Sequence, residues 1–390
     1  MGELEGEVRE GPARRPWRRP GRGLAAGGLA AGGRVASGLC LPLAGSALAA
    51  IFAAAAVLAA CLVEPAPGLL PEADYRPPAL LSAGAAGERL FLLGFDEEIR
   101  PVEGSFALAR SAAAGAAGGS AEEVPGSGPP EAVAEGAGLS VLFSESTSPG
   151  ADYLLSGEVA DLRGNTTRFV LGFVGWNPRP PRLRLSEFQT AKNSSLSNSH
   201  RDYAELEVLA DGNLGGVELA YASSVKAYRF RFPAAEVRAG DFVVLHLAPE
   251  GLPEELDETG SELGLSGGVD ARPYARDFWS AAGGLPDESG AAALYERPGG
   301  GLMGGFFYAN AEKAGPVGSG RLGELLSGLS AAGAWPLAGG EPLWEDAFLW
   351  KPSSARSLCR SPGSEEAGPG AWYLTAAGGQ SPGAANPPPP

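Results

Sequence analysis

Cysteine and histidine are scarce in this chain of 390 residues, which holds three Cys and two His. Cys40 and Cys61 lie in the N-terminal region, and Cys359 is far from both. A disulfide framework needs several paired cysteines, and a zinc site needs closely spaced Cys and His ligands. The sequence therefore argues against both, and we expect no cofactor.

Lysine is also rare, since only four of the 30 basic residues are Lys. The chain carries 46 acidic residues and a formal net charge of −16. Seven Arg and four Glu lie within residues 1–60, which leaves 23 basic against 42 acidic residues in the remainder. Such a surface repels phosphate backbones, so we expect no nucleic-acid partner.

The spacing of nucleophiles, bases and acids shows no catalytic constellation. A nucleophilic triad needs a Ser or Cys with a His and an acid. His200 lies in a polar segment, and His246 lies in an alternating strand pattern that favours the edge of a core. Neighbouring arginines could activate Cys359, but a free thiol on a loop is the simpler interpretation. The glycine-rich segment 299–305 lacks the Lys-Ser/Thr ending of a phosphate loop.

The N-terminal region combines basic residues with a long uncharged run. Seven Arg lie between Arg9 and Arg34, and residues 35–63 carry no charge, which is the pattern of a secretory signal. The run ends in Leu58-Ala59-Ala60-Cys61, which resembles a bacterial lipobox. The resemblance implies a lipoprotein signal peptide over residues 1–60 and lipidation of the Cys61 thiol, which anchors the chain in a membrane. A transmembrane anchor is the alternative, because the uncharged run is long enough to span a bilayer.

Residues 61–87 are rich in Pro, Ala and Gly, and they predict a flexible tether. Residues 88–179 predict a small sandwich of short strands, with a low-complexity loop over 111–138. The expected strands are Leu90–Phe95, Ser105–Ala109, Leu139–Phe143, Tyr153–Val159 and Phe169–Phe173.

This unit resembles a bacterial Ig-like domain of the surface-layer type in three short motifs. They are Phe95-Asp-Glu-Glu followed by Pro101, Pro149-Gly-Ala-Asp-Tyr153, and Asp161-Leu-Arg-Gly-Asn165. Asp161 and Asn165 could supply oxygen ligands to calcium. A Gly-Asn turn between two strands is the simpler interpretation.

Residues 180–387 contain the best-formed strand pattern, with period-two alternation or short apolar runs bounded by Gly, Pro, Asn or Asp. The expected strands are Leu183–Phe188, Tyr203–Val208, Gly216–Tyr221, Tyr228–Phe232 and Asp241–Leu247. A later pair, Ala292–Tyr295 and Gly305–Tyr308, flanks three glycines and predicts a hairpin.

This second unit resembles the lamin-tail domain, an Ig-like sandwich, in the version found in spirochaete lipoproteins. The early motifs are Leu185-Ser-Glu187, Tyr203-Ala-Glu-Leu-Glu207, Asn213-Leu-Gly-Gly216, Phe230-Arg-Phe-Pro233 and Ala239-Gly-Asp-Phe-Val-Val-Leu245. The late ones are Arg356-Ser-Leu-Cys-Arg360 and Ser381-Pro-Gly-Ala-Ala-Asn386. The resemblance implies structural roles for Glu187, Glu205 and Glu207.

Two insertions interrupt the second unit. Residues 249–286 carry a cluster of acidic side chains, which could bind a cation but is more simply a solvated acidic loop. Residues 314–340 place leucines at positions 322, 325, 326 and 329, which predicts one short amphipathic helix. We interpret Trp279, Trp344, Trp350 and Trp372 as core or rim aromatics, with a Trp-lined sugar site as the alternative.

Together these patterns predict an all-β chain of two tandem Ig-like β-sandwiches, after a signal peptide and a tether, with a disordered tail at 388–390. The expected place is the bacterial cell envelope, on its periplasmic or surface face, with the membrane as one partner and a protein or polysaccharide as another. The expected function is binding or structural support. The alternative is an envelope hydrolase, or an accessory module that recruits a nuclease or phosphatase.

Overall fold

The computed structural model describes residues 75–111, 122–123, 128–190, 201–312 and 317–390. Across these ranges the chain is all-β, as the sequence predicts, with strands in several sheets and a single α-helix. No helix in this part of the chain is long and apolar enough to cross a membrane. The lipobox at Leu58, Ala59, Ala60 and Cys61 lies outside the described residues, as does His200.

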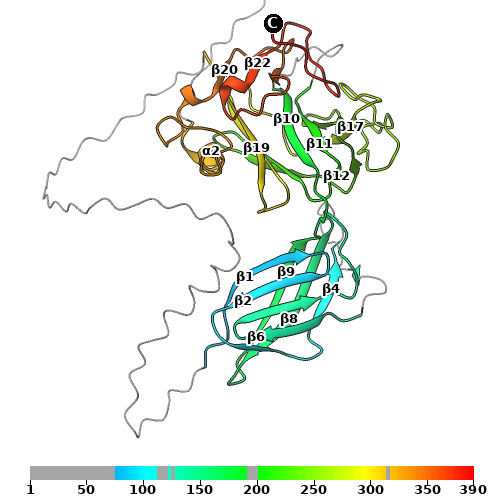
Figure 1. The fold of residues 1–390 in the computed structure, drawn as a ribbon, viewed down its shortest axis with the longest axis vertical. Helices are drawn as coiled ribbons and strands as arrows, with labels where there is room; N and C mark the ends of the chain where they lie inside the picture. Colours follow the sequence, from blue (N-terminus) through cyan, green and yellow to red (C-terminus); the bar gives the residue numbers. More distant parts are fainter. Residues whose placement is uncertain (1–74, 112–121, 124–127, 191–200, 313–316) are drawn as a thin grey trace, which may run out of the picture. The chain divides into compact units, whose positions relative to one another are not determined.

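The first sandwich packs two antiparallel sheets against one core (Figure 1). One sheet has the order β1-β2-β7-β6, with bounds β1 (Leu80–Gly87), β2 (Leu90–Phe95), β7 (Gly138–Leu142) and β6 (Glu131–Glu135). The other centres on β8 (Asp152–Asp161) and contains β9 (Thr166–Val174), β3 (Ile99–Pro101), β4 (Ala107–Arg110) and β5 (Glu122–Glu123). Strand β9 pairs along the whole of β8, so β3 and β4 share its other edge.

All five strands expected in this unit are present within a few residues of their predicted bounds. Four further strands were not predicted: the short β3 and β5, and the longer β1 and β6. Residues 80–87 form β1 instead of belonging to the tether, and residues 131–135 form β6 inside the predicted low-complexity loop. Both are built mainly from Ala, Gly and Glu, which have low β-propensity, so pairing with β2 and β7 decides their conformation.

The turn between β8 and β9 holds the candidate metal ligands of this unit. Asp161 Oδ1 accepts hydrogen bonds from the backbone N–H groups of Arg163 and Asn165, both at 2.8 Å, and Oδ2 accepts one from Asn165 Nδ2 at 2.7 Å. Gly164 supplies the positive φ of 93° that the turn requires. The loop's own donors thus occupy the Asp161 oxygens, and the turn interpretation is confirmed.

The second sandwich also packs two large sheets around one core. One has the order β17-β16-β11-β10-β21-β22, with bounds β17 (Arg276–Trp279), β16 (Phe242–His246), β11 (Tyr203–Ala210), β10 (Arg182–Gln189), β21 (Leu358–Arg360) and β22 (Trp372–Leu374). The other has the order β14-β13-β18-β19-β20, with bounds β14 (Ala227–Arg231), β13 (Glu218–Ala222), β18 (Ser289–Tyr295), β19 (Leu302–Asn310) and β20 (Phe348–Trp350). A small ladder joins β12 (Gly212–Asn213) to β15 (Glu236–Val237).

Apolar side chains at alternate positions along the strands build this core. Phe188 of β10 stacks on Phe306 of β19 with ring centroids 4.9 Å apart, and Phe306 stacks on Trp372 at 3.9 Å. The five early strands and the hairpin predicted from sequence are all present. Trp350 and Trp372 are buried, so the interpretation of these residues as core or rim aromatics is confirmed.

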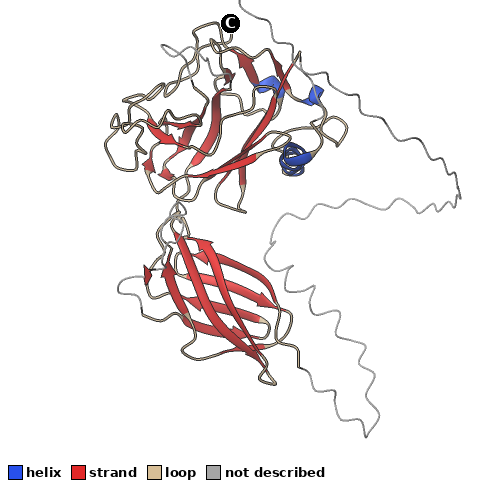
Figure 2. Cartoon of the chain, turned by 180° about the vertical axis from the view of Figure 1, so that it is seen from behind, coloured by secondary structure: helices blue, strands red, loops and turns tan. Residues whose placement is uncertain are grey.

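Helix α2 (Gly320–Ala331) covers the outer face of the second sheet and lies over β13, β18 and β19 (Figure 1, Figure 2). Its leucines were predicted from their spacing, and three of them, Leu322, Leu326 and Leu329, are buried. The sheet beneath carries small residues in one cross-strand row, Ala220, Ala293 and Gly305, which lets the helix approach closely. Two 3₁₀ turns, η1 (Trp344–Asp346) and η2 (Pro369–Ala371), complete the helical content of the described residues.

Candidate ligand-binding site

Strand β14 is the terminal strand of the helix-covered sheet. Its hairpin with β13 is closed by the Ser223 N–H, which donates to the Lys226 carbonyl at 2.8 Å. Hydrogen bonding alternates along an antiparallel ladder, so the backbone groups of Tyr228 face β13. Those of Ala227 and Arg229 therefore point away from the sheet. The edge of β14 offers backbone donors and acceptors at regular spacing.

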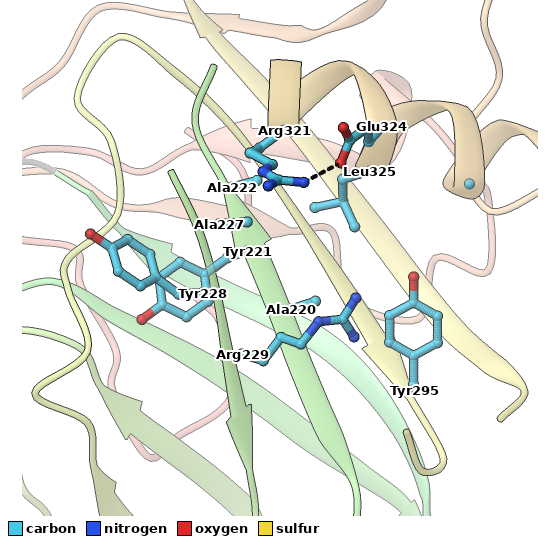
Figure 3. A pocket seen from close by; sticks show the side chains of 11 residues that line it. Ala220, Tyr221, Ala222, Ala227, Tyr228, Arg229, Tyr295, Arg321, Glu324 and Leu325 are labelled. Carbon is cyan, nitrogen blue, oxygen red and sulfur yellow. Dashed lines mark hydrogen bonds and ion pairs between the residues drawn. The ribbon is translucent and has the colours of Figure 1, made fainter. Parts of the chain in front are cut away.

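One hollow, the outer hollow, lies between β14 and helix α2 (Figure 3). It has a volume of about 380 Å³. Ala220 and Ala222 form its floor, and because their side chains are single methyl groups, a space remains above them. Arg229 and Tyr295 stand on one side of this floor, and Arg321 of the helix stands on the other.

Two arginines and one glutamate, Glu324, line the outer hollow, and each arginine is ion-paired with a glutamate. Arg229 Nη1 is ion-paired with Glu218, whose side chain is only 8% exposed. Arg321 Nη1 is 3.0 Å from Glu324 Oε2, and both of these side chains are more than half exposed. Exposed pairs contribute about 0–1 kcal/mol, so Arg321 can turn to another anion at little cost.

A second hollow, the inner hollow, lies on the other face of the same hairpin and has a volume of about 420 Å³. Its lining includes Tyr221, Tyr228, Lys226, Leu285 and Pro286. The Tyr221 hydroxyl donates to the Gly283 carbonyl at 2.7 Å, which ties the loop 283–287 to β13. Burial raises the pKa of Tyr221 to about 12, so this hydroxyl stays a donor at neutral pH.

Tyr221 and Tyr228 line both hollows and lie opposite each other on β13 and β14, with ring centroids 5.3 Å apart. The two hollows therefore flank one terminal strand on its two faces. Sequence reasoning found the strand but not the hollows. The available signal was the alternation of Ala and Tyr in residues 220–222, which leaves one face of β13 without bulk.

The motif residues of the second unit meet in a different place, on the face of the β10–β11 sheet that points away from the core between the two sheets. Glu187 accepts hydrogen bonds from the Tyr203 hydroxyl at 2.7 Å and from the Ser381 hydroxyl at 2.9 Å. Glu205 accepts one from the Gly383 N–H at 2.6 Å. Asn386 Nδ2 donates to the Ser186 and Arg360 carbonyls, both at 3.0 Å. The C-terminal motif 381–386 is therefore a strap that donates hydrogen bonds to two buried carboxylates, although Glu205 Oε1 has no hydrogen-bond partner among the described residues.

Burial and the nearby Glu187 raise the pKa of Glu205 well above its usual range. Glu207, on the same strand, instead makes a 2.6 Å ion pair with Arg184. Glu205 is thus buried beneath the strap, whereas the Glu207 side chain is partly exposed and held by Arg184.

Cys359 lies on β21 and is fully buried, so the interpretation of this residue as a loop thiol is wrong. The sequence pattern of three residues was too short to show a strand, which pairs with β10 and β22. Burial, followed by the charge of Glu187, raises the pKa of the thiol. The alternative of an arginine-activated Cys359 is therefore also wrong.

His246 is fully buried, and its Nε2 lies 2.8 Å from Asp277 Oδ1. Its ring stacks on Trp279 with centroids 3.9 Å apart. Burial raises the pKa of Asp277, although the hydrogen bond from His246 partly offsets this. Within the described residues His246 Nδ1 has no hydrogen-bond partner, so no nucleophile completes a triad there.

The acidic insertion is only partly the solvated loop that its composition predicts. Glu258 and Asp270 are buried, and the Glu258 carboxylate accepts hydrogen bonds from the backbone N–H groups of Leu265, Ser266 and Asp277. These acids cap backbone groups in a long loop, which composition alone could not show. Across the described ranges, no three His, Cys, Asp or Glu side chains are placed to hold a metal ion.

In sequence, the second sandwich matches a family model, and part of the chain is similar to a protein of another organism. Residues 181–374, just under half of the chain, match a family model, TP_1001_2nd, described as "protein second domain". A protein of Treponema pallidum (strain Nichols), described as uncharacterized, is 34% identical over 150 residues, which cover 38% of this chain and 36% of the relative. The chain thus spans about a third of that relative's length.

A solved structure of a DUF4876 family protein from Bacteroides thetaiotaomicron VPI-5482 also matches this chain. The match covers 71% of this chain and 90% of the chain in the solved structure. Its sequence identity is 12% and its TM-score is 0.23, a level at which the likeness carries no argument. The chain is therefore similar to a spirochaete protein over part of its length, which agrees with the spirochaete-type resemblance of its motifs.

Proposed function

We propose that this chain is a lipid-anchored cell-envelope protein that acts as a binding module through the β14 edge of its second sandwich. One observation carries the proposal: two hollows flank the same terminal strand on its two faces. The buried carboxylates of Glu187, Glu205 and Glu258, by contrast, accept hydrogen bonds from the chain itself.

The proposal keeps the domain division inferred from sequence. An Ig-like unit over 88–179, with β1 added at its N-terminal side, would act as a spacer, and a lamin-tail-like unit over 180–387 would hold the site. The two-sheet cores of both units support this division. The spirochaete relative supports a bacterial source, and the proposed envelope location depends on the motif Leu58-Ala59-Ala60-Cys61.

The anchor is tested by metabolic labelling with a palmitate analogue in a bacterial host. We expect the full chain to be labelled and Cys61→Ala to lose the label. Cys40→Ala is the matched control, because Cys40 lies in the same uncharged run but has Leu39 directly before it, where a lipobox has a small residue. Labelling of Cys61→Ala at the level of the unmodified chain would contradict the anchor.

The binding site is tested by hydrogen exchange on the full chain in detergent, with and without polysaccharide and peptide fractions of a bacterial envelope. We expect one fraction to slow exchange in residues 218–231. Strand β6, the terminal strand of a sheet in the other sandwich, is the internal control. If no fraction protects β14 more than β6, the binding proposal fails.

A further inference from the structure

We infer that β14 binds an extended peptide segment of a partner protein by strand addition, with acidic side chains entering the outer hollow and apolar ones entering the inner hollow. This inference rests on the proposed binding function and names the class of its ligand. Strand addition combines main-chain hydrogen bonds for affinity with alternate side-chain pockets for specificity.

The backbone of β14 provides the first requirement. It is the terminal strand of its sheet, and the N–H and C=O groups of Ala227 and Arg229 point away from β13. A strand of five residues is about 17 Å long. An incoming segment of similar length can therefore form a regular ladder along β14, which spans Ala227–Arg231.

The two hollows provide the second requirement. Successive side chains of a strand point to opposite faces of its sheet. A strand laid beside β14 would therefore direct its side chains alternately to the outer hollow, above Ala220 and Ala222, and to the inner hollow beside Tyr228. A carbohydrate lacks the regularly spaced main-chain N–H and C=O groups that pair with the edge of a strand. The arrangement favours a peptide.

Charge and polarity then select the side chains. In the outer hollow Arg229 and Arg321 stand on opposite sides, so each can pair with a separate incoming carboxylate. Arg321 is the easier one to recruit, because an incoming carboxylate has to replace only its exposed pair with Glu324. Charge-assisted hydrogen bonds from guanidinium to carboxylate are among the stronger polar contacts in proteins. The inner hollow presents the apolar surface of Leu285, Pro286 and the Tyr228 ring, and its lining also includes the charged side chains of Asp202, Lys226 and Asp287. It therefore suits an apolar or aromatic side chain, best one with a polar tip such as that of Tyr.

A second copy of the chain is a poor occupant of the same edge. Symmetric antiparallel pairing of β14 with itself would place the central residue, Arg229, opposite the Arg229 of the other copy. Like charges directly opposite each other on a sheet are destabilising. The partner strand must carry acidic residues opposite the basic residues of β14.

The test uses the full chain in detergent and a fluorescent capped peptide, Val-Glu-Tyr-Glu-Val, with binding followed by anisotropy. Arg321→Glu should weaken binding by about tenfold or more, because it removes a cation and adds a repelling charge. Arg238→Glu makes the same charge change at an exposed site outside both hollows, and it should alter binding by less than about twofold. Ala227→Pro should abolish binding, because it removes an outward N–H group, while circular dichroism confirms that the variant stays folded.

Two N-methylated peptides test the ladder itself. One carries N-methyl groups on both Glu residues and the other carries one on Tyr. Strand addition predicts that only one of the two binds, because the N–H groups that face β14 belong to alternate residues. Equal binding of both peptides overturns strand addition. Protection of β14 by a polysaccharide without peptide binding also overturns it and leaves the proposed binding function standing. Absence of protection by any fraction overturns both.

Discussion

Replacing Glu205 with Gln should stabilise the second sandwich at neutral pH and flatten the dependence of its stability on pH. Glu205 is fully buried on β11, beside Glu187, and the strap 381–386 closes over both. Burial and the charge of Glu187 raise the pKa of Glu205 well above the value of 4.5 of a free side chain. The folded chain therefore holds a proton on Glu205 that the unfolded chain releases.

The sign of the effect follows from that shift. The stability that Glu205 contributes is fully present below the unfolded pKa of 4.5, and it is lost as the pH rises toward the folded pKa. Each pH unit in that window lowers the free energy of unfolding by about 1.4 kcal/mol. Glutamine keeps an oxygen for the Gly383 N–H but does not titrate. The free energy of unfolding of the variant should therefore exceed that of the natural chain by the largest amount at the alkaline end of the window.

The assay is urea unfolding of the full chain at a series of pH values from 4.5 to 8.5, followed by tryptophan fluorescence. Glu207→Gln is the matched control, because it removes a carboxylate from the same strand where the side chain is partly exposed and paired with Arg184. It should leave the slope of stability against pH unchanged. A Glu205→Gln variant with the slope of the natural chain would refute the reasoning.

Two further predictions concern packing and reactivity. Gly305→Ala should lower the free energy of unfolding by about 1–3 kcal/mol, because the new Cβ would collide with the buried Leu329 of α2. Gly304→Ala is the adjacent control on β19; its new Cβ meets nothing within 4 Å, so it should change stability little. Equal melting temperatures for the two variants would contradict the close packing of α2 against β19. In a chain with Cys40 and Cys61 replaced by Ala, Cys359 should resist iodoacetamide at pH 8.5 until denaturant is added, because burial raises the pKa of its thiol. Rapid alkylation of the folded chain would show that the thiol is exposed.

Strand patterns of period two allowed most of the fold to be predicted. Strand β2 was predicted with its observed bounds, and β10, β11 and β16 were predicted within a few residues. Each of these strands carries large apolar side chains on a face that the opposite sheet covers. Strand β1 was missed because its Ala and Gly side chains give no such alternation, and only its pairing with β2 makes it a strand.

The site was less predictable because it depends on what faces the strands from elsewhere in the chain. The sequence of β14 shows an alternating strand, but the outer hollow also needs Arg321, which is 92 positions beyond Arg229. Likewise, the hydrogen-bond partner of the Asp277 carboxylate is His246. His246 lies on β16, where it pairs with Trp279 of the parallel strand β17. Such long-range pairings leave no local trace in the sequence.

The motifs that suggested a family report on the fold more than on the ligand. The polar groups of the Ser381-Pro-Gly-Ala-Ala-Asn386 motif donate hydrogen bonds to Glu187, to Glu205 and to the carbonyls of Ser186 and Arg360. Side chains committed in this way cannot contact a partner. Resemblance at these positions therefore implies a shared sandwich closed by a C-terminal strap. In the proposed binding function, specificity comes from residues outside the strap, such as the exposed Arg229 and Arg321 and the half-buried Tyr228 at the β14 edge.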